Sequence, residues 1–153
     1  MNAVSKPTLV GGTEAANTEV VQISLSRVPS LELGAILRHV FPSEELWTWN
    51  PAELRLVPAT PTRIENVLVT FADEPLVNAS VLDFQLETGN FPEGWRPYCL
   101  YFLGSSYLTK TAREGIRIAY YQKEDGQEEG VWVSRLEHIT NTLALNARIP
   151  VFR

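Results

Sequence analysis

The stretch "EGWRPYCLYFLGSSYLTKTAREGIRIAYYQ", residues 93–122, decides the fold, because it holds two runs of strand-forming residues joined by a polar turn. It contains all five tyrosines of the chain, one of its four tryptophans and its only cysteine. Aromatic and β-branched residues favour strands, so "YCLYFL" and "GIRIAYYQ" are predicted to be neighbouring central strands. Adjacent residues of a strand point to opposite faces, so the tyrosines cannot all lie on one side of the sheet.

The sequence that follows predicts a hairpin and then a helix. "GVWVS", residues 130–134, is a third strand-like run, and the polar residues 123–130 before it are typical of a solvated hairpin loop. Ser134 and Glu137 have the spacing of a capping box, which predicts a helix beginning there. Its inward side chains are expected to be Leu136, Ile139 and Leu143. The apolar tail, residues 149–153, is expected to pack back on the body.

Two elements are predicted near the beginning of the chain. Residues 18–26 alternate in polarity, which predicts a half-buried strand with Ile23 on its apolar face. Residues 29–43, "PSLELGAILRHVFPS", predict a helix that begins at Ser30 and ends at Pro42. Its apolar stripe at helical spacing consists of Leu33, Ile36, Leu37, Val40 and Phe41.

The middle of the chain is divided by prolines. We expect a short helix in residues 43–50, "SEELWTWN", and a short strand in residues 52–61. Residues 81–87, "VLDFQLE", alternate between apolar and polar side chains, which predicts a strand.

The pattern in residues 62–72, "TRIENVLVTFA", favours two structures at once. Thr62 and Glu65 have capping-box spacing, and the apolar residues match one helical face. The run is also rich in β-branched residues, which favours a strand. We give a slight preference to a strand over residues 66–72.

Taken together, the elements predict an α+β fold, with a mainly antiparallel sheet (a C-terminal meander) packed against two or more helices. A chain of 153 residues fits one domain, so residues 18–153 are expected to form it after a flexible or irregular lead-in at residues 1–17. The lead-in does not resemble a signal peptide, and one cysteine cannot form an internal disulfide. We therefore expect a soluble, cytoplasmic protein.

No motif in the sequence assigns catalysis, a cofactor or a metal. Cys99 lies in a run that is apolar on both faces, where a free cysteine behaves as a small buried side chain. His39 and His138 are the only histidines, and neither belongs to a zinc-binding pattern. We expect no catalytic residue, no cofactor and no metal site, and we interpret Cys99 as structural.

One third of the chain is strongly acidic. Residues 42–93 carry two arginines against nine carboxylates, a formal charge of −7 within a chain of net charge −5. Tryptophan is favoured at interfaces, and charge complementarity steers a basic partner. The sequence thus predicts a candidate partner-binding surface for a basic protein. Its residues are Trp47, Trp49, Glu44 and Glu45. The alternative is that the acidic residues keep the domain soluble while both indoles pack inward.

The aromatic strands offer a second candidate site. Residues 95–122 have a local charge of +3, and tyrosines are interleaved with the basic residues. We interpret the exposed tyrosine edge as a candidate ligand-binding edge. Its residues are Arg96, Tyr101, Arg117 and Tyr121. Because the whole chain is acidic, we expect neither nucleic acid nor a membrane as a partner.

The order of the predicted elements resembles that of SUKH-type toxin-immunity proteins. The resemblance lies in a helix near "LGAILRHVF", a middle meander, the strand "IAYYQ" and a closing helix after "VWVSRLEHI". It implies a small, acidic, cytoplasmic α+β domain that binds a toxin. The acidic, aromatic block and the absence of a convergent polar motif predict a non-catalytic protein-interaction module with an acidic and aromatic surface. The alternative is a small-ligand-binding protein or an enzyme with a pocket beside the aromatic sheet.

Overall fold

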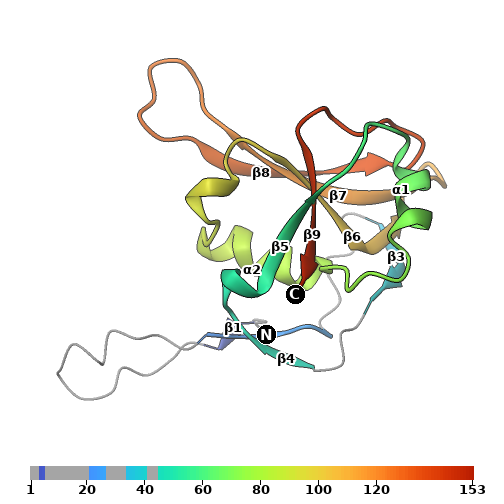
Figure 1. Ribbon diagram of the computed structural model, residues 1–153, viewed down its shortest axis with the longest axis horizontal. Coiled ribbons are helices and arrows are strands. Elements are labelled where there is room, and N and C mark those ends of the chain that lie inside the picture. Colours follow the sequence, from blue (N-terminus) through green and yellow to red (C-terminus); the bar gives the residue numbers. More distant parts are fainter. Residues whose placement is uncertain (1–3, 6–20, 27–33, 41–44) are drawn as a thin grey trace.

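The structure, a computed structural model, describes residues 4–5, 21–26, 34–40 and 45–153 (Figure 1). The main sheet has six strands in the order β5-β9-β6-β7-β8, and β3 also pairs with β6. Its strands are β3 (Ala35–His39), β5 (Leu54–Pro58), β6 (Cys99–Leu108), β7 (Glu114–Gln122), β8 (Val131–His138) and β9 (Ala147–Phe152). The smaller sheet consists of β1 (Val4–Ser5), β2 (Gln22–Ser24) and β4 (Leu46–Thr48). The helices are α1 (Ile64–Thr70) and α2 (Ala79–Thr88), with 3-10 turns η3 (Pro51–Glu53) and η4 (Glu93–Trp95).

These elements confirm the predicted α+β class. The sheet is mostly antiparallel, and β6, β7 and β8 form the predicted C-terminal meander. The strand predicted around Ile23 is confirmed as β2, the one predicted within residues 52–61 as β5, and the tail packs on the body as β9. Of the predicted lead-in, only residues 4–5 lie within the described structure, where they pair with β2.

Strand β6 organises the main sheet because its neighbours change along its length. One edge pairs with β7, while the other pairs in parallel with β9 at its start and antiparallel with β3 at its end. The change occurs around Gly104, whose backbone N–H donates to the carbonyl of Val77 at 3.0 Å. A Cβ at this position would lie 2.5 Å from the Val77 oxygen, so only glycine permits the close approach.

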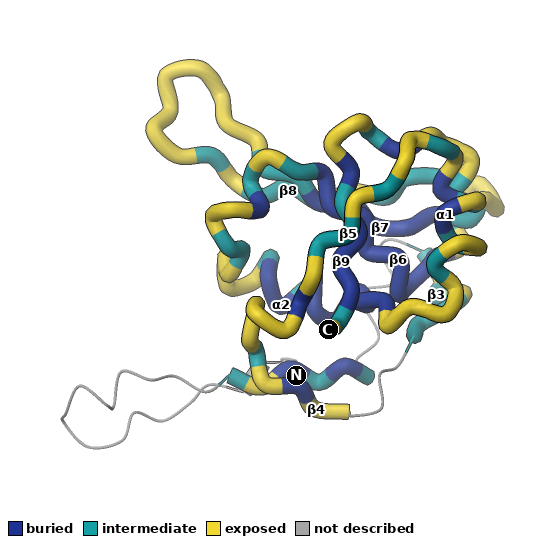
Figure 2. The backbone as a smooth tube through the Cα atoms, in the orientation of Figure 1, coloured by how far each residue is buried: buried dark blue, intermediate teal, exposed yellow. Residues whose placement is uncertain are grey.

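The two faces of the main sheet are covered by different elements, with the buried strands between them (Figure 2). On one face Leu100 and Phe102 pack with Phe84 of α2 and with Ile23 of the small sheet. On the other face, residues at alternate positions of the same strand, such as Tyr101, pack with α1 and with the segment after β8. This alternation places Tyr101 on the side of the sheet that α1 covers.

The strand predicted over residues 81–87 is wrong, because these residues form the greater part of α2. The Asn78 side chain accepts a hydrogen bond from the backbone N–H of Ser80, and Gly89 ends the helix with a left-handed φ of 71°. Most of the helix is buried, because it lies between the small sheet and the main sheet. Because α2 is buried on several sides, its sequence needs apolar residues at positions that also alternate, so the same pattern fits a helix or a strand.

The preferred strand over residues 66–72 is also wrong, and the helical alternative is correct. The expected capping box does not form: Thr62 Oγ1 accepts a hydrogen bond from Asn66 Nδ2. The first N–H groups of α1 donate instead to the carbonyls of Asn141 and Ile139, which lie far away in sequence. Tertiary contacts therefore cap this helix.

Three helices predicted from local patterns are strands instead. Residues 35–39 of the helix predicted over 29–43 form β3, and Leu37, expected on its apolar stripe, is half exposed. Apart from residues 34 and 40, the rest of that predicted helix lies outside the described residues. Residues 46–48 form β4 in place of the short helix predicted over 43–50. Strand β8 continues through Ser134 to His138, because all eight of its residues pair with β7. Pairing with distant strands thus outweighs local helical periodicity. Two helices on which the resemblance to SUKH-type proteins rests are consequently absent from the described residues.

Candidate functional site

A cavity of about 530 Å³ opens on the face of the main sheet that α1 covers in part. Its floor comes from strands β6, β7 and β8, and its rim from residues 96–98 and from the loop before β9. We call it the arginine–tyrosine pocket. It is lined by Arg96, Pro97, Tyr98, Cys99, Tyr101, Ile118, Tyr120, Tyr121, Arg135, Glu137, Thr142, Ala144 and Asn146. Residues from five segments of the chain therefore converge on one space.

Three of the four tyrosine rings that line the pocket lie against a guanidinium group. The Arg96 Cζ atom lies 4.5 Å from the ring centroid of Tyr121, and the Arg135 Cζ atom lies 5.5 Å from that of Tyr120. A third arginine, Arg148 of β9, stacks in the same way at 4.3 Å on the lining residue Tyr98. Stacking of this kind holds planar cations in fixed orientations beside planar aromatic surfaces.

The charges at the pocket are partly compensated by carboxylates. Arg135 Nε lies 3.4 Å from Glu137 Oε1 on the same strand, and the Glu137 side chain is only 18% exposed. Arg96 pairs with Glu129 at 3.3 Å and more distantly with Glu93 at 3.8 Å. Among the lining residues, two arginines face one carboxylate, while Glu93 and Glu129, which pair with Arg96, lie outside the lining.

Tyr101 and Cys99 form the inner part of the lining. The Tyr101 hydroxyl accepts a hydrogen bond from the backbone N–H of Ala144 at 2.9 Å, which ties the loop before β9 to β6. Burial raises the pKa of Tyr101 to about 12. Burial also raises the pKa of the Cys99 thiol above its ordinary value. Both groups are therefore protonated near neutral pH, and a protonated thiol is a weak nucleophile.

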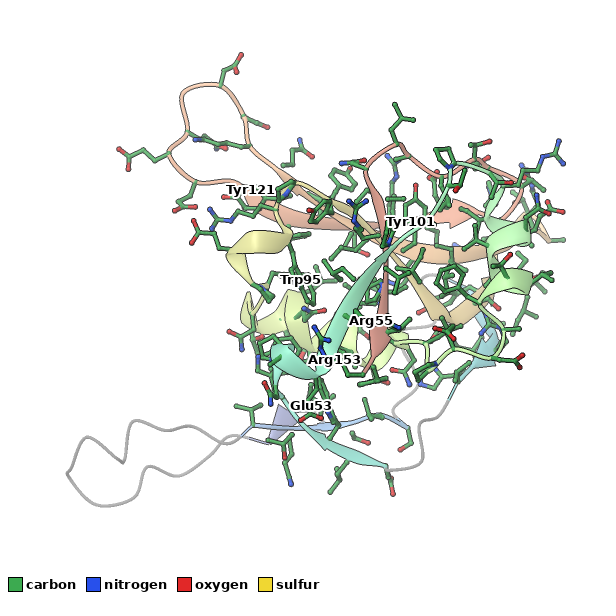
Figure 3. The ribbon with its side chains drawn as sticks, in the orientation of Figure 1. Glu53, Arg55, Trp95, Tyr101, Tyr121 and Arg153 are labelled. Atoms are coloured by element: carbon green, nitrogen blue, oxygen red, sulfur yellow. The ribbon has the colours of Figure 1, made fainter. Side chains whose placement is uncertain are left out.

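Three of the four residues predicted as a ligand-binding edge meet at this pocket. Arg96, Tyr101 and Tyr121 line it, and Figure 3 shows Tyr121 at the base of the β7–β8 hairpin and Tyr101 nearer the centre of the sheet. Arg117 does not line the pocket. It faces the opposite side, where it is buried against α2 and forms an ion pair with Asp83.

The residues predicted for a partner-binding surface are arranged differently. Trp47 is buried, and its Nε1 donates a hydrogen bond to Glu53 Oε1 at 3.3 Å. Trp49 is half-buried, with its ring centroid 5.1 Å from that of Phe84. Both indoles thus pack towards the core, while Glu45 is exposed. Glu44 lies outside the described residues.

Sequence reasoning missed Arg135 and Glu137, which line the pocket. Both lie in the part of β8 that was predicted to be helical. Their positions opposite Ile118 and Ile116 of β7 place them on the pocket face of the sheet. Continuing the strand beyond Ser134 would have revealed the alternation that puts these two side chains beside the tyrosines.

His39 and Cys99 do not form a catalytic pair. His39 Nδ1 lies 2.7 Å from Ser105 Oγ, and its Nε2 lies 3.1 Å from the carbonyl oxygen of Leu25. These contacts lie beside α2, whereas Cys99 faces the pocket on the other side of the sheet. Among the residues that the structure describes, no three His, Cys, Asp or Glu side chains are grouped so that they could hold a metal ion.

Comparisons of the chain with protein-family models, with curated proteins and with solved structures found no significant match. Within the described ranges, no helix is long and apolar enough to cross a membrane.

Proposed function

We propose that this protein binds a small ligand in the arginine–tyrosine pocket, and that the ligand combines an anionic group with a planar apolar part. The observation that carries this proposal is the convergence of guanidinium groups stacked on tyrosine rings around a cavity of about 530 Å³. Ligand sites are commonly concave, with aromatic walls and a few polar groups that fix orientation.

The chemistry of the lining selects the two parts of the ligand. Guanidinium groups bind carboxylates and phosphates through paired N–H donors. Stacking on tyrosine uses the face of the guanidinium group, so its N–H donors, which lie in the plane of that group, stay directed to the sides. The ring edges of Tyr98 and Tyr120, and the faces that no guanidinium covers, offer apolar contact to a planar group. The single Glu137 beside Arg135 favours a ligand that also presents a hydrogen-bond donor.

The proposed role is binding rather than catalysis. Burial keeps the Cys99 thiol protonated, and neither histidine lies beside it: His39 contacts Ser105 beside α2, and His138 lies opposite Gly115, at the other end of β7 from Cys99. A thiol requires a nearby base or positive charge to act as a nucleophile at neutral pH. The polar groups of the pocket are therefore interpreted as orienting groups.

Titration with small probes followed by ¹⁵N NMR tests the proposal. Benzoate and phenyl phosphate are expected to shift the amide of Ala144, whose N–H contacts Tyr101, whereas benzylamine, with its opposite charge, is expected to bind more weakly. Arg135→Gln should weaken benzoate binding, and Arg113→Gln, at an exposed arginine outside the lining, is the matched control. Equal responses to anionic and cationic probes, or none at all, would contradict the proposed function.

A second candidate function is capture of a basic protein by the acidic part of the chain. It is favoured by the exposure of most carboxylates described in residues 42–93, including Asp73 and Glu87. Since both indoles pack inward, such a partner would be held mainly by charge. Binding of a lysine-rich peptide should fall steeply between low and high salt and should weaken in the double variant Asp73→Lys/Glu87→Lys. Salt-insensitive binding would count against it.

A further inference from the structure

We infer that Glu129 occupies the anion position of Arg96 in the ligand-free protein, and that the ligand is a monocarboxylate which displaces it and releases the β7–β8 hairpin loop. This inference rests on the proposed function of the arginine–tyrosine pocket and adds its ligand class and its regulation. The loop, residues 123–130, projects from the body at the end of β7 and β8 (Figure 1).

Glu129, Arg96 and Tyr121 form a cluster in which each side chain contacts the other two. Its Oε2 atom lies 3.3 Å from Arg96 Nη2 and accepts a hydrogen bond from the Tyr121 hydroxyl at 3.0 Å. Arg96 stacks in turn on the ring of Tyr121. One carboxylate oxygen is thus held between a guanidinium and a phenol, which is the arrangement expected for a bound carboxylate ligand.

The base of the loop is fixed on the same tyrosine. The backbone N–H of Gly130 donates to the Tyr121 hydroxyl at 2.5 Å. A Cβ on Gly130 would lie 2.3 Å from the Gln122 carbonyl oxygen and 2.9 Å from the Tyr121 ring, so the close approach requires glycine. Any change at the Tyr121 hydroxyl is therefore transmitted to the backbone of the loop.

Arg96 and Tyr121 form the wall between two cavities. Both line the arginine–tyrosine pocket and an adjoining cavity of about 340 Å³. The second cavity is also lined by Phe91 and Trp132, whose rings stack with centroids 4.1 Å apart. A carboxylate at Arg96 would therefore have aromatic surfaces within reach on either side.

The Glu129 contact is suited to exchange. Its side chain is 72% exposed, and an exposed ion pair contributes little to stability because water screens it. The displaced carboxylate would remain in water with the rest of the loop, whose residues 123–129 are exposed and carry four carboxylates against one lysine. A ligand gains the same contact with Arg96 and adds apolar burial in the pocket.

The surrounding charges favour one negative charge on the ligand over two. Glu93 lies 3.8 Å from Arg96, and Glu137 lies within the pocket beside Arg135. These carboxylates repel a second negative charge more than they repel the first, which Arg96 compensates. A monocarboxylate such as benzoate should therefore bind more tightly than a phosphate dianion of similar size.

The inference is tested by titrating benzoate and phenyl phosphate into the wild type, Glu129→Gln and Glu128→Gln, with ¹⁵N NMR as the readout. Glu128→Gln is the matched control, because Glu128 is exposed and has no contact with Arg96. Glu129→Gln should bind benzoate about two- to five-fold more tightly than the wild type, the range expected from removing one exposed competing ion pair. In the wild type, benzoate should shift the Gly130 amide towards its position in free Glu129→Gln.

The outcomes separate this inference from the proposed function. Equal benzoate affinity in all three proteins with an unmoved Gly130 amide would overturn the displacement of Glu129 and leave the pocket as a ligand site. Tighter binding of phenyl phosphate than of benzoate would overturn the monocarboxylate assignment. Failure of both probes to bind the wild type and Glu129→Gln would overturn the proposed function, and the inference with it.

Discussion

Arg117 of β7 and Asp83 of α2 form an ion pair that joins the main sheet to its covering helix. The arginine is 7% exposed and is the one charged residue that is buried among those the structure describes. The Asp83 side chain, at 29% exposure, connects the pair to solvent. Because a buried guanidinium cannot give up its proton, this position of α2 requires a carboxylate.

Replacing Asp83 should therefore destabilise the protein. Asp83→Ala is expected to lower the free energy of unfolding by about 2–4 kcal/mol, slightly less than for a fully buried pair because the carboxylate is partly hydrated. Urea unfolding followed by tryptophan fluorescence measures the change. Glu87→Ala, at an exposed position of the same helix, should change it by no more than about 0.5 kcal/mol. Similar losses in the two variants would contradict a structural role for the pair.

Gly104 should tolerate no side chain. The Cβ of Gly104→Ala would meet the carbonyl oxygen of Val77 at 2.5 Å, so either β6 or the segment before α2 must shift. We expect a loss of about 1–3 kcal/mol in the free energy of unfolding, as for other overpacked sites. Gly94→Ala is the control, since its Cβ would meet no atom within 4 Å. A wild-type melting temperature for Gly104→Ala would show that the close approach is not required.

His39 should make the protein less stable in mild acid. Burial lowers the pKa of His39, although the Leu25 carbonyl and, more weakly, Asp83 oppose this effect. The unfolded chain then binds a proton more readily than the folded chain, so stability is fully present above pH 6.5 and falls as pH drops below it. The melting temperature should fall between pH 7.5 and 5.5, where carboxylates stay ionised. His39→Gln should reduce that fall, and an unchanged pH dependence in this variant would refute the assignment to His39.

Cys99 should react slowly with alkylating reagents in the folded protein. Burial raises the pKa of the Cys99 thiol, so little of it is thiolate at neutral pH. The residue is only 8% exposed, so a reagent also has little access to the sulfur. Iodoacetamide labelling at pH 7.5, followed by mass spectrometry, should be at least about ten-fold slower than in the urea-unfolded chain. Equal rates in the two states would show that the thiol is accessible and activated.

The strands of the meander could be recognised from sequence because local preference and tertiary environment agree there. In β6 and β7, aromatic and β-branched residues occupy both faces, and both faces are buried. The hairpin loop at 123–130 was equally clear, since polar residues and two glycines interrupt the apolar runs. Elsewhere the preferences conflicted: α2 alternates like a strand yet is buried on most sides, and β3 has helical spacing yet pairs with β6.

The candidate site was predicted only in part for a related reason. Aromatic strands beside arginines pointed to Arg96, Tyr101 and Tyr121, which do meet in the pocket. Sequence could not separate Tyr121 from Arg117, because both occupy the same face of β7 by alternation and only the residue near the end of the strand reaches the pocket. The indoles of Trp47 and Trp49 similarly required knowledge of which surfaces the small sheet covers.

The sequence by itself determined the α+β class, the C-terminal meander and an aromatic, arginine-bearing edge, because alternation and residue type are local properties. Only the tertiary structure decided that residues 79–88 are helical, that β8 runs on to His138 and that Glu129 reaches Arg96. These features depend on contacts between residues far apart in the chain, whose free energies exceed the small local preferences of short segments.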